Sequence, residues 1–305
     1  MTGFRGRASS RYEILACAGV FDALAVAAIT AACTSIGSAQ QPVGSSGIVI
    51  PAFATAPLHL DGHLDESIWS VSDSITDFRQ REPVEGEGAT EATTIKLVRD
   101  REALYIAVRA CDRDTTAIRA SQLRRDSDLT VDDYVTLMLD SFHDRRGAFL
   151  FRTNPNGAMW DAQLNGFEDV NENWNGIWDV AVTRDSTGWT AEFRIPFQTL
   201  RFRRGATSFG FNANRFIRRR NEEVLWRSYG RTEGLLQLLH EGEVTGLVGL
   251  GRARGLELRP YALARATASE HDLTGASLGG SEVSAKAGLD AKLAVSPTLT
   301  ADLTA

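Results

Sequence analysis

Apolar and polar residues alternate with a period of two through most of residues 58–250. The clearest runs are residues 104–110, 135–140, 189–195 and 209–214. This period is typical of strands that bury one face and expose the other. Turn signals such as Asp61-Gly62 and the Asn-Pro-Asn-Gly sequence at residues 154–157 separate the runs, and helical stretches are short. Residues 40–56, rich in Gly, Ser and Pro, predict a linker, and residues 57–250 predict an antiparallel β-sandwich in an all-β protein.

A longer alternation follows the predicted sandwich. It runs through residues 256–267 and 283–295 and resumes at residues 299–305, after the turn sequence Ser296-Pro297-Thr298. Runs of about ten alternating residues joined by tight turns are typical of strands in transmembrane β-barrels. The smallest such barrels need about eight strands. We therefore expect residues 251–305 to be the incomplete start of an outer-membrane β-barrel in a longer protein; the alternative is a short amphipathic hairpin packed on the sandwich.

The N-terminus has the order of a secretory signal peptide. Three arginines precede an apolar stretch over residues 14–32, and the small residues Gly37-Ser38-Ala39 follow it. We expect residues 1–39 to be cleaved and the protein to be exported to the periplasm or outer membrane of a Gram-negative-type bacterium. One alternative is a membrane anchor, although Asp22 shortens the apolar run below the roughly 20 residues that span a bilayer. Another is a lipoprotein attached through Cys33.

Composition narrows the possible functions. The 33 basic and 39 acidic residues give a net charge of −6, which argues against nucleic acid as a partner because nonspecific nucleic-acid binding depends on neutralising phosphates.

The chain contains no HExxH, CxxC, GxGxxG, P-loop or GxSxG motif. Carboxylates that a glycosidase would need are present, but nothing in the sequence selects a pair of them. These are Asp161, Glu168, Asp169, Glu172, Asp179 and Glu192. We assign no catalytic residue.

An acidic loop precedes the strand predicted around Val135. Oxygen-rich loops of this kind can hold Ca²⁺, although the spacing does not match the EF-hand loop. The alternative is a solvated loop whose carboxylates cap turns and pair with Arg124 and Arg125. The candidate calcium ligands are Asp126, Asp128, Asp132 and Asp133.

The stretch from residue 154 to residue 178 combines tryptophans with amide and carboxylate side chains. Sugar rings present apolar C–H faces with a rim of hydroxyls, so flat aromatic rings and planar polar groups suit them. Trp174 lies in a polar loop that demands no core residue, whereas Trp178 begins an alternating strand and is expected in the core. The candidate sugar-binding residues are Trp174, Trp160, Asn154, Asp161, Gln163 and Asn173.

Several motifs in fixed order resemble those of the carbohydrate-binding module family 9-like domain. They are LDGHLDE at residues 60–66 with Trp69, LYIAV at 104–108, Asp132-Asp133, and GWTAEFRIPF at 188–197. The resemblance covers about residues 57–250. Within this family, the chain resembles bacterial proteins in which the module precedes a large outer-membrane β-barrel of unknown function. Residues 200–202 and 221–223, together with Trp226, fit that subgroup.

The resemblance implies a β-sandwich that binds polysaccharide or oligosaccharide and takes part in carbohydrate catabolism. Family members hold a sugar between two aromatic residues, for which Trp174 and Trp160 are the candidates. Our leading hypothesis is an exported, non-catalytic sugar-binding module attached to an outer-membrane barrel. One alternative is a component of an O-glycosyl hydrolase. Another is a structural domain that plugs or gates the barrel, whose arginine-rich run at residues 215–220 pairs with an acidic lumen or surface; a solvated strand edge would also explain that run.

Overall fold

The structure is a computed structural model that describes residues 47–166, 169–250, 256–267, 282–296 and 299–304. The predicted signal peptide, residues 1–39, lies outside these ranges. Among the residues described, no helix has the length and apolar character needed to cross a membrane.

The first of two large sheets, sheet A, has nine strands. Seven of them follow the order β1-β15-β13-β7-β8-β9-β10, and β14 pairs with both β13 and β4. The strands are β1 (Ile48–Val49), β4 (Arg79–Glu82), β7 (Tyr134–Asp140), β8 (Gly147–Thr153), β9 (Met159–Asn165), β10 (Asp169–Asn171), β13 (Phe209–Ile217), β14 (Glu222–Leu225) and β15 (Gly242–Val244).

Sheet B has six strands, with β11-β12-β6-β5-β2 in order and β3 paired with β5. They are β2 (Ala52–Phe53), β3 (Ser74–Ile75), β5 (Thr93–Arg99), β6 (Ala103–Cys111), β11 (Asp179–Asp185) and β12 (Gly188–Pro196). Helical structure in the described residues is short, as the sequence predicted. It consists of α2 (Ser67–Val71) and the 3₁₀ turns η1 (Thr115–Ala117), η2 (Leu129–Val131), η3 (Arg218–Arg220) and η4 (Leu238–His240).

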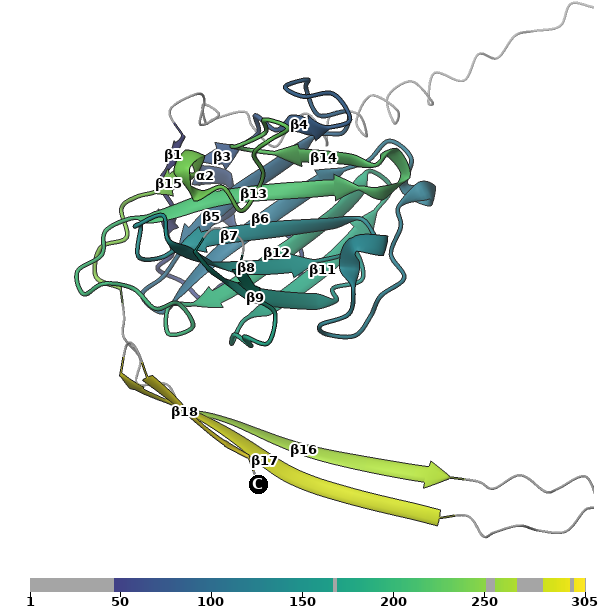
Figure 1. Ribbon diagram of the computed structural model, residues 1–305, viewed down its shortest axis with the longest axis vertical. Coiled ribbons are helices and arrows are strands. Elements are labelled where there is room, and N and C mark those ends of the chain that lie inside the picture. Colours follow the sequence, from purple (N-terminus) through teal and green to yellow (C-terminus); the bar gives the residue numbers. More distant parts are fainter. Residues whose placement is uncertain (1–46, 167–168, 251–255, 268–281, 297–298, 305) are drawn as a thin grey trace, which may run out of the picture. The chain divides into compact units, whose positions relative to one another are not determined.

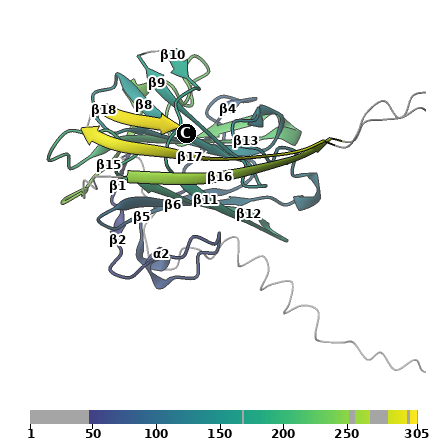
Figure 2. The same cartoon turned by 90° about the horizontal axis from the view of Figure 1, so that it is seen from below.

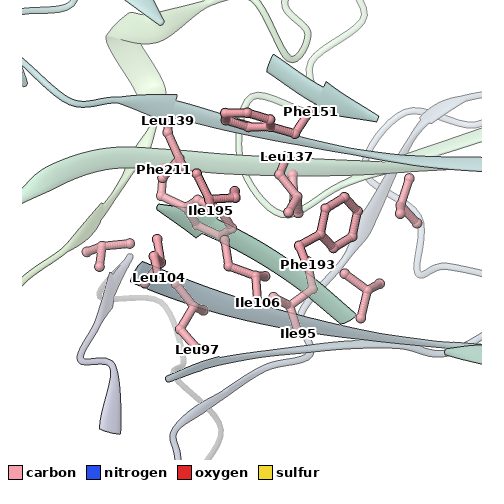
Figure 3. Close-up of a cluster of buried hydrophobic side chains, with 14 of the residues drawn as sticks. Ile95, Leu97, Leu104, Ile106, Leu137, Leu139, Phe151, Phe193, Ile195 and Phe211 are labelled. Carbon is pink, nitrogen blue, oxygen red and sulfur yellow. The ribbon is translucent and has the colours of Figure 1, made fainter. Parts of the chain in front are cut away.

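The two sheets enclose one core built from the inward-facing residues of both (Figures 1 and 3). Leu137, Phe151 and Phe211 project from sheet A toward Ile106 and Phe193 of sheet B (Figure 3). These apolar positions alternate with outward-facing ones, because successive side chains of a strand point to opposite faces. The predicted β-sandwich is therefore confirmed. Trp178, expected in the core, is 2% exposed.

The second half of the predicted linker is not a linker. β1 pairs in parallel with β15 of sheet A, and β2 pairs in parallel with β5 of sheet B. The sandwich is accordingly mixed rather than purely antiparallel. Val49 is fully buried, so this segment contributes to the core as well as to both sheets. Two-residue strands carry too little alternation to be found from sequence.

The outer face of each sheet is also partly covered. On sheet A, Met138, Leu150 and Trp160 belong to a second apolar cluster that includes Leu235 and Leu238 of the loop before β15. On sheet B, α2 places Trp69 in a third cluster, formed by Ala54, Trp69, Val98, Ala103, Tyr105 and Ala107. Polar and aromatic side chains gather on the same outer face of sheet A, and Trp160 belongs both to them and to the apolar cluster.

The C-terminal strands form a third, separately hydrogen-bonded sheet. β16 (Leu256–Thr267), β17 (Glu282–Ser296) and β18 (Leu299–Thr304) pair antiparallel (Figures 1 and 2). The register sets Leu258 opposite Ala291 and Arg259 opposite Asp290, so the apolar phases of the strands share one face. The long alternating strands expected here are present, and no closed barrel is seen among the described residues.

Candidate functional site

Arginine and aromatic side chains follow one another across the outer face of sheet A. The guanidinium carbon of Arg152 lies 4.4 Å from the ring centroid of Trp160 and 4.5 Å from that of Tyr134. Tyr134 stacks on Phe216 with centroids 5.3 Å apart and planes 8° apart. Arg218 covers the far ring, with its guanidinium carbon 5.6 Å from the Phe216 centroid. We name this set of five residues the arginine–aromatic row.

Strand register creates the row. Phe216 of β13 is paired with Tyr134 of β7, and Arg152 of β8 is paired with Trp160 of β9. Each of these residues has the outward phase of its strand, whereas the intervening residues point into the core. Four adjacent strands therefore bring together side chains that are up to 82 positions apart in the chain, Tyr134 to Phe216, and η3 adds Arg218 directly after β13.

The guanidinium of Arg152 is held in place, but not all of its N–H groups are hydrogen-bonded. Its Nε donates to Thr136 Oγ1 at 2.9 Å, and within the described residues neither terminal nitrogen donates to an acceptor. Burial lowers the pKa of Arg152, while Tyr134 and Glu172 oppose the shift. An arginine stays charged under such a shift. A cation held between two rings, with N–H groups still available, is a preformed donor for a polar ligand.

The neighbouring carboxylate is already paired. Glu223 of β14 accepts from Arg81 at 2.6 Å and from the side chain of Asn214 at 2.8 Å. Asn214 lies on the same face as Phe216, two positions earlier on β13. This network holds one end of the row in place.

The two tryptophans chosen from sequence lie on opposite faces of sheet A. Trp160 belongs to the outer cluster and is 9% exposed. Trp174 packs against the core, with its ring centroid 4.8 Å from Phe149 and 6.0 Å from Phe151. The structure therefore does not bring them together as two walls of one slot. The role of Trp174 in sugar binding stays a prediction.

Two of the other candidates are buried and satisfy polar groups of the fold. Asn154, fully buried, donates to Asp132 Oδ2 at 2.8 Å and accepts the amide N–H of Ala158 at 2.9 Å. Asp161 is also fully buried, where it pairs with Arg125 and accepts the Gly176 N–H at 2.5 Å. Burial raises the pKa of Asp161, against the effect of these two partners.

The remaining two candidates are less enclosed. Gln163 is half-buried on β9, and Asn173 is exposed in the loop after β10, where its backbone N–H donates to Asn171 Oδ1 at 3.2 Å. Neither belongs to the arginine–aromatic row. The six residues chosen from sequence thus contribute one member, Trp160, to that row.

The proposed calcium loop does not gather its carboxylates. Among the described residues, no group of three or more His, Cys, Asp or Glu side chains is placed to hold a metal ion. Asp128 caps η2 by accepting from Thr130, Asp126 lies 3.7 Å from Arg125, and Asp133 accepts the backbone N–H of Arg218 at 2.8 Å.

Asp132 is a buried carboxylate whose charge is stabilised by hydrogen-bond donors rather than by a metal ion. Burial disfavours its charge, yet donors from Gln122, Asn154 and Ser121 together lower its pKa. Amide and hydroxyl donors therefore provide the stabilisation that a cation would provide. Of the alternative raised for this loop, the capping by Asp128 and the pairing of Asp126 with Arg125 are present, whereas Asp132 and Asp133 are buried rather than solvated.

Asp161 and Glu192, two of the carboxylates considered for hydrolysis, lie on different sheets. Asp161 lies on β9 of sheet A, while Glu192 lies on the outer face of sheet B and accepts the N–H groups of Asp61 and Gly62, each at 3.3 Å. Burial raises the pKa of Glu192 to about 7. Glu168 lies outside the described residues. Both buried carboxylates stabilise loops of the fold.

The arginine-rich run at residues 215–220 is used largely inside the domain. Arg215 is fully buried, donates to Ala92 O and Cys111 O, and lies 3.8 Å from Asp112. Arg219 pairs with Asp112 and Glu91, each at 2.8 Å. The arginine run, on which the hypothesis of a barrel plug was based, is thus engaged mostly in hydrogen bonds and ion pairs inside the domain.

We expect replacement of Trp174 by alanine to lower the free energy of unfolding by about 2 kcal/mol, since a half-buried ring loses its contacts with two phenylalanines. Urea denaturation and sugar calorimetry on the same sample separate the possible roles. A structural Trp174 changes stability alone, whereas a sugar-binding Trp174 also loses affinity while the protein is folded. Trp174→Phe is the matched control, because it keeps a ring on Phe149.

Sequence reasoning missed Tyr134, Arg152, Phe216 and Arg218. β8 reads Gly-Ala-Phe-Leu-Phe-Arg-Thr, and its apolar residues on both faces hide the alternation. The sequence could have shown only that Tyr134, Arg152 and Trp160 occupy outward-facing positions of three strands. The strand register is needed to show that these side chains are neighbours.

The two packed sheets, with the arginine–aromatic row on the outer face of sheet A, define a β-sandwich domain. The family model described as "Carbohydrate family 9 binding domain-like" matches residues 60–225, which is more than half of the chain. The chain belongs to this family.

Two solved structures are similar to this chain. A putative carbohydrate-binding protein from Bacteroides uniformis is 11% identical with a TM-score of 0.50, and the match covers 65% of this chain and 98% of that one. A family 9 carbohydrate-binding module from Caldicellulosiruptor kristjanssonii, in complex with cellotriose, is 18% identical with a TM-score of 0.47 and coverages of 65% and 92%. The comparison with curated proteins finds no match.

Proposed function

We propose that this chain binds carbohydrate through the arginine–aromatic row of sheet A. The observation that carries the proposal is Arg152, held between Tyr134 and Trp160 with its terminal nitrogens unpaired among the described residues. Sugar hydroxyls accept such N–H groups, and nearby aromatic surface suits the apolar faces of sugar rings. Membership of the family supports the same ligand class. The family 9 modules from Caldicellulosiruptor kristjanssonii, whose structures hold cellotriose and glucose, supply examples of that class.

Isothermal titration calorimetry of the full chain against soluble xylan, cello-oligosaccharides and acidic oligosaccharides tests the proposal. We expect heat of binding with at least one of these ligands and at least a tenfold loss of affinity in Arg152→Gln, because a hydrogen bond from a charged donor contributes about 1.5–3 kcal/mol. Arg101→Gln is the matched control, since Arg101 is exposed in the β5–β6 turn of sheet B.

Absence of heat with every sugar would contradict carbohydrate binding. Full sugar affinity in a folded Arg152→Gln protein would show that the binding site lies outside the row, although carbohydrate binding itself would still hold. Arg152→Lys adds a geometric test, because lysine keeps the charge but loses the planar fork that binds two acceptors at once.

We also propose that the module is exported and acts in carbohydrate catabolism beside an outer-membrane β-barrel. The arginine-led apolar stretch before residue 39 supports export. The register of β16 to β18, which keeps the apolar phases on one face, supports a sheet with one face toward lipid. Fractionation of expressing cells tests both. Recovery of the protein in the cytoplasm with residues 1–39 uncleaved would contradict the proposal.

A further inference from the structure

The two cations of the arginine–aromatic row have no ion-pair partner among the described residues. Most of the other charged groups around them do: Arg81 pairs with Glu223, and Arg219 pairs with Asp112. Arg218 is exposed, and the hydrogen bond to Asp133 comes from its backbone N–H rather than from its guanidinium. Both guanidiniums of the row are therefore positioned by aromatic rings instead of by carboxylates.

The rings also set the distance between the charges. Tyr134 and Phe216, stacked at 5.3 Å, lie between Arg152 and Arg218. One carboxylate cannot contact both guanidiniums across two stacked rings. A ligand that engages both must carry more than one acceptor group along its length, as an oligosaccharide does.

Resting on the proposed sugar-binding function, we infer that the row selects acidic oligosaccharides, with uronate carboxylates pairing with Arg152 and Arg218. Guanidinium and carboxylate match as planar, bidentate partners. A hydrogen bond with charge on both sides is roughly twice as strong as a neutral one. Stacked rings hold each guanidinium in place, so less side-chain freedom is lost when the ligand binds.

The carboxylates near Arg152 must be accounted for. Asp128 is occupied by Thr130, and Glu223 by Arg81 and Asn214. Glu172 is exposed, interacts electrostatically with Arg152, and forms no ion pair within the described residues. Glu172 thus competes with an acidic ligand for the same cation. Removing its charge is expected to strengthen binding of acidic oligosaccharides.

The test compares trigalacturonate with cellotriose by calorimetry on the full chain at low salt. We expect trigalacturonate to bind at least tenfold more tightly, with the preference falling as salt screens the charges. Arg218→Gln should reduce the ratio of acidic to neutral affinity about tenfold, and Glu172→Gln should increase it. Arg101→Gln, with the same charge change as Arg218→Gln but on sheet B, should leave both affinities unchanged.

The outcomes separate the inference from the function on which it rests. Binding of cellotriose with equal or weaker binding of trigalacturonate would overturn the acidic preference and keep carbohydrate binding. No binding of either ligand, or of the other sugars in the panel, would overturn both. Equal loss of trigalacturonate affinity in Arg218→Gln and Arg101→Gln would show attraction to overall charge and reject a specific contact. Thermal denaturation of each variant verifies that it is folded.

Discussion

Replacement of Gly188 by alanine is expected to lower the free energy of unfolding by about 4 kcal/mol. Gly188 opens β12 with φ of +143°, in a region that residues with a side chain rarely adopt. A Cβ built at this position would lie 2.1 Å from Ala110 O and 2.9 Å from Cys111 Cα of the adjacent strand β6. Both atoms belong to the backbone, so relief requires moving a strand in the middle of sheet B.

Gly205→Ala is the matched control for this prediction. Gly205 also has positive φ, +77°, but a Cβ there would meet nothing within 4 Å. Its replacement by alanine should lower the free energy of unfolding by only about 1 kcal/mol, the cost of a residue with a side chain at positive φ. Urea denaturation of the two variants measures the difference. Equal losses of stability would mean that sheet B absorbs the clash and that the close approach of the strands is not important.

Replacement of Glu241 by glutamine is expected to stabilise the protein at high pH. Both carboxylate oxygens of Glu241 are buried without a hydrogen-bond donor in the described residues, and they lie close to Gly210, where a Cβ would be 2.1 Å from Oε1. Gly210 is paired with Asp140, itself fully buried. Burial, followed by the nearby charge of Asp140, raises the pKa of Glu241 to about 8.

The direction of the pH effect follows from proton binding. A carboxyl whose folded pKa is raised holds its proton more tightly in the folded state, so stability falls as pH rises from about 4.5 toward 8. At pH 9 the glutamine variant should exceed the parent protein in free energy of unfolding by about 5 kcal/mol, because the pKa rises from 4.5 to about 8 and each pKa unit corresponds to about 1.4 kcal/mol. At pH 5 the two should be nearly equal, since an amide can donate to Asp140 as the protonated acid does.

Chemical denaturation at pH 5, 7 and 9 provides the measurement. Glu85→Gln serves as control, because Glu85 is exposed and the variant changes net charge by the same amount. Parallel stability curves for the parent protein and Glu241→Gln would show that Glu241 is ionised without cost, and the prediction would be wrong. Part of the alkaline loss should persist in the variant, since burial also raises the pKa of Glu192 to about 7.

The strands were predictable because each needs only local alternation. β6, β7, β12 and β13 all contain the runs read from the sequence, and the inward phases are those of the core. The arginine–aromatic row depends instead on how four strands are aligned. Shifting one strand by two residues would preserve every local pattern and remove the contact between Arg152 and Trp160. The local pattern therefore predicts which face of the sheet each residue points to. It does not predict which residue of the neighbouring strand lies opposite.

Polar side chains were the least predictable part of the site. Asn154 and Asp161 have the chemistry of sugar ligands, and both are fully buried as partners of backbone and side-chain groups. Their residue types fit either use, because an amide or carboxylate that binds hydroxyls also satisfies N–H groups in a turn. The environment decides between these uses, and it depends on contacts with residues distant in sequence such as Arg125.

The pairing of β1 with β15 has a consequence for folding kinetics. Ile48 meets Glu243, so the first described strand must wait for a partner that lies roughly two hundred residues later in the chain. Pairings of such high contact order form slowly. Until β1 docks, β15 is an open edge whose backbone groups can pair with another molecule. We therefore expect intermolecular strand exchange and aggregation to compete with folding in the interval before β1 docks.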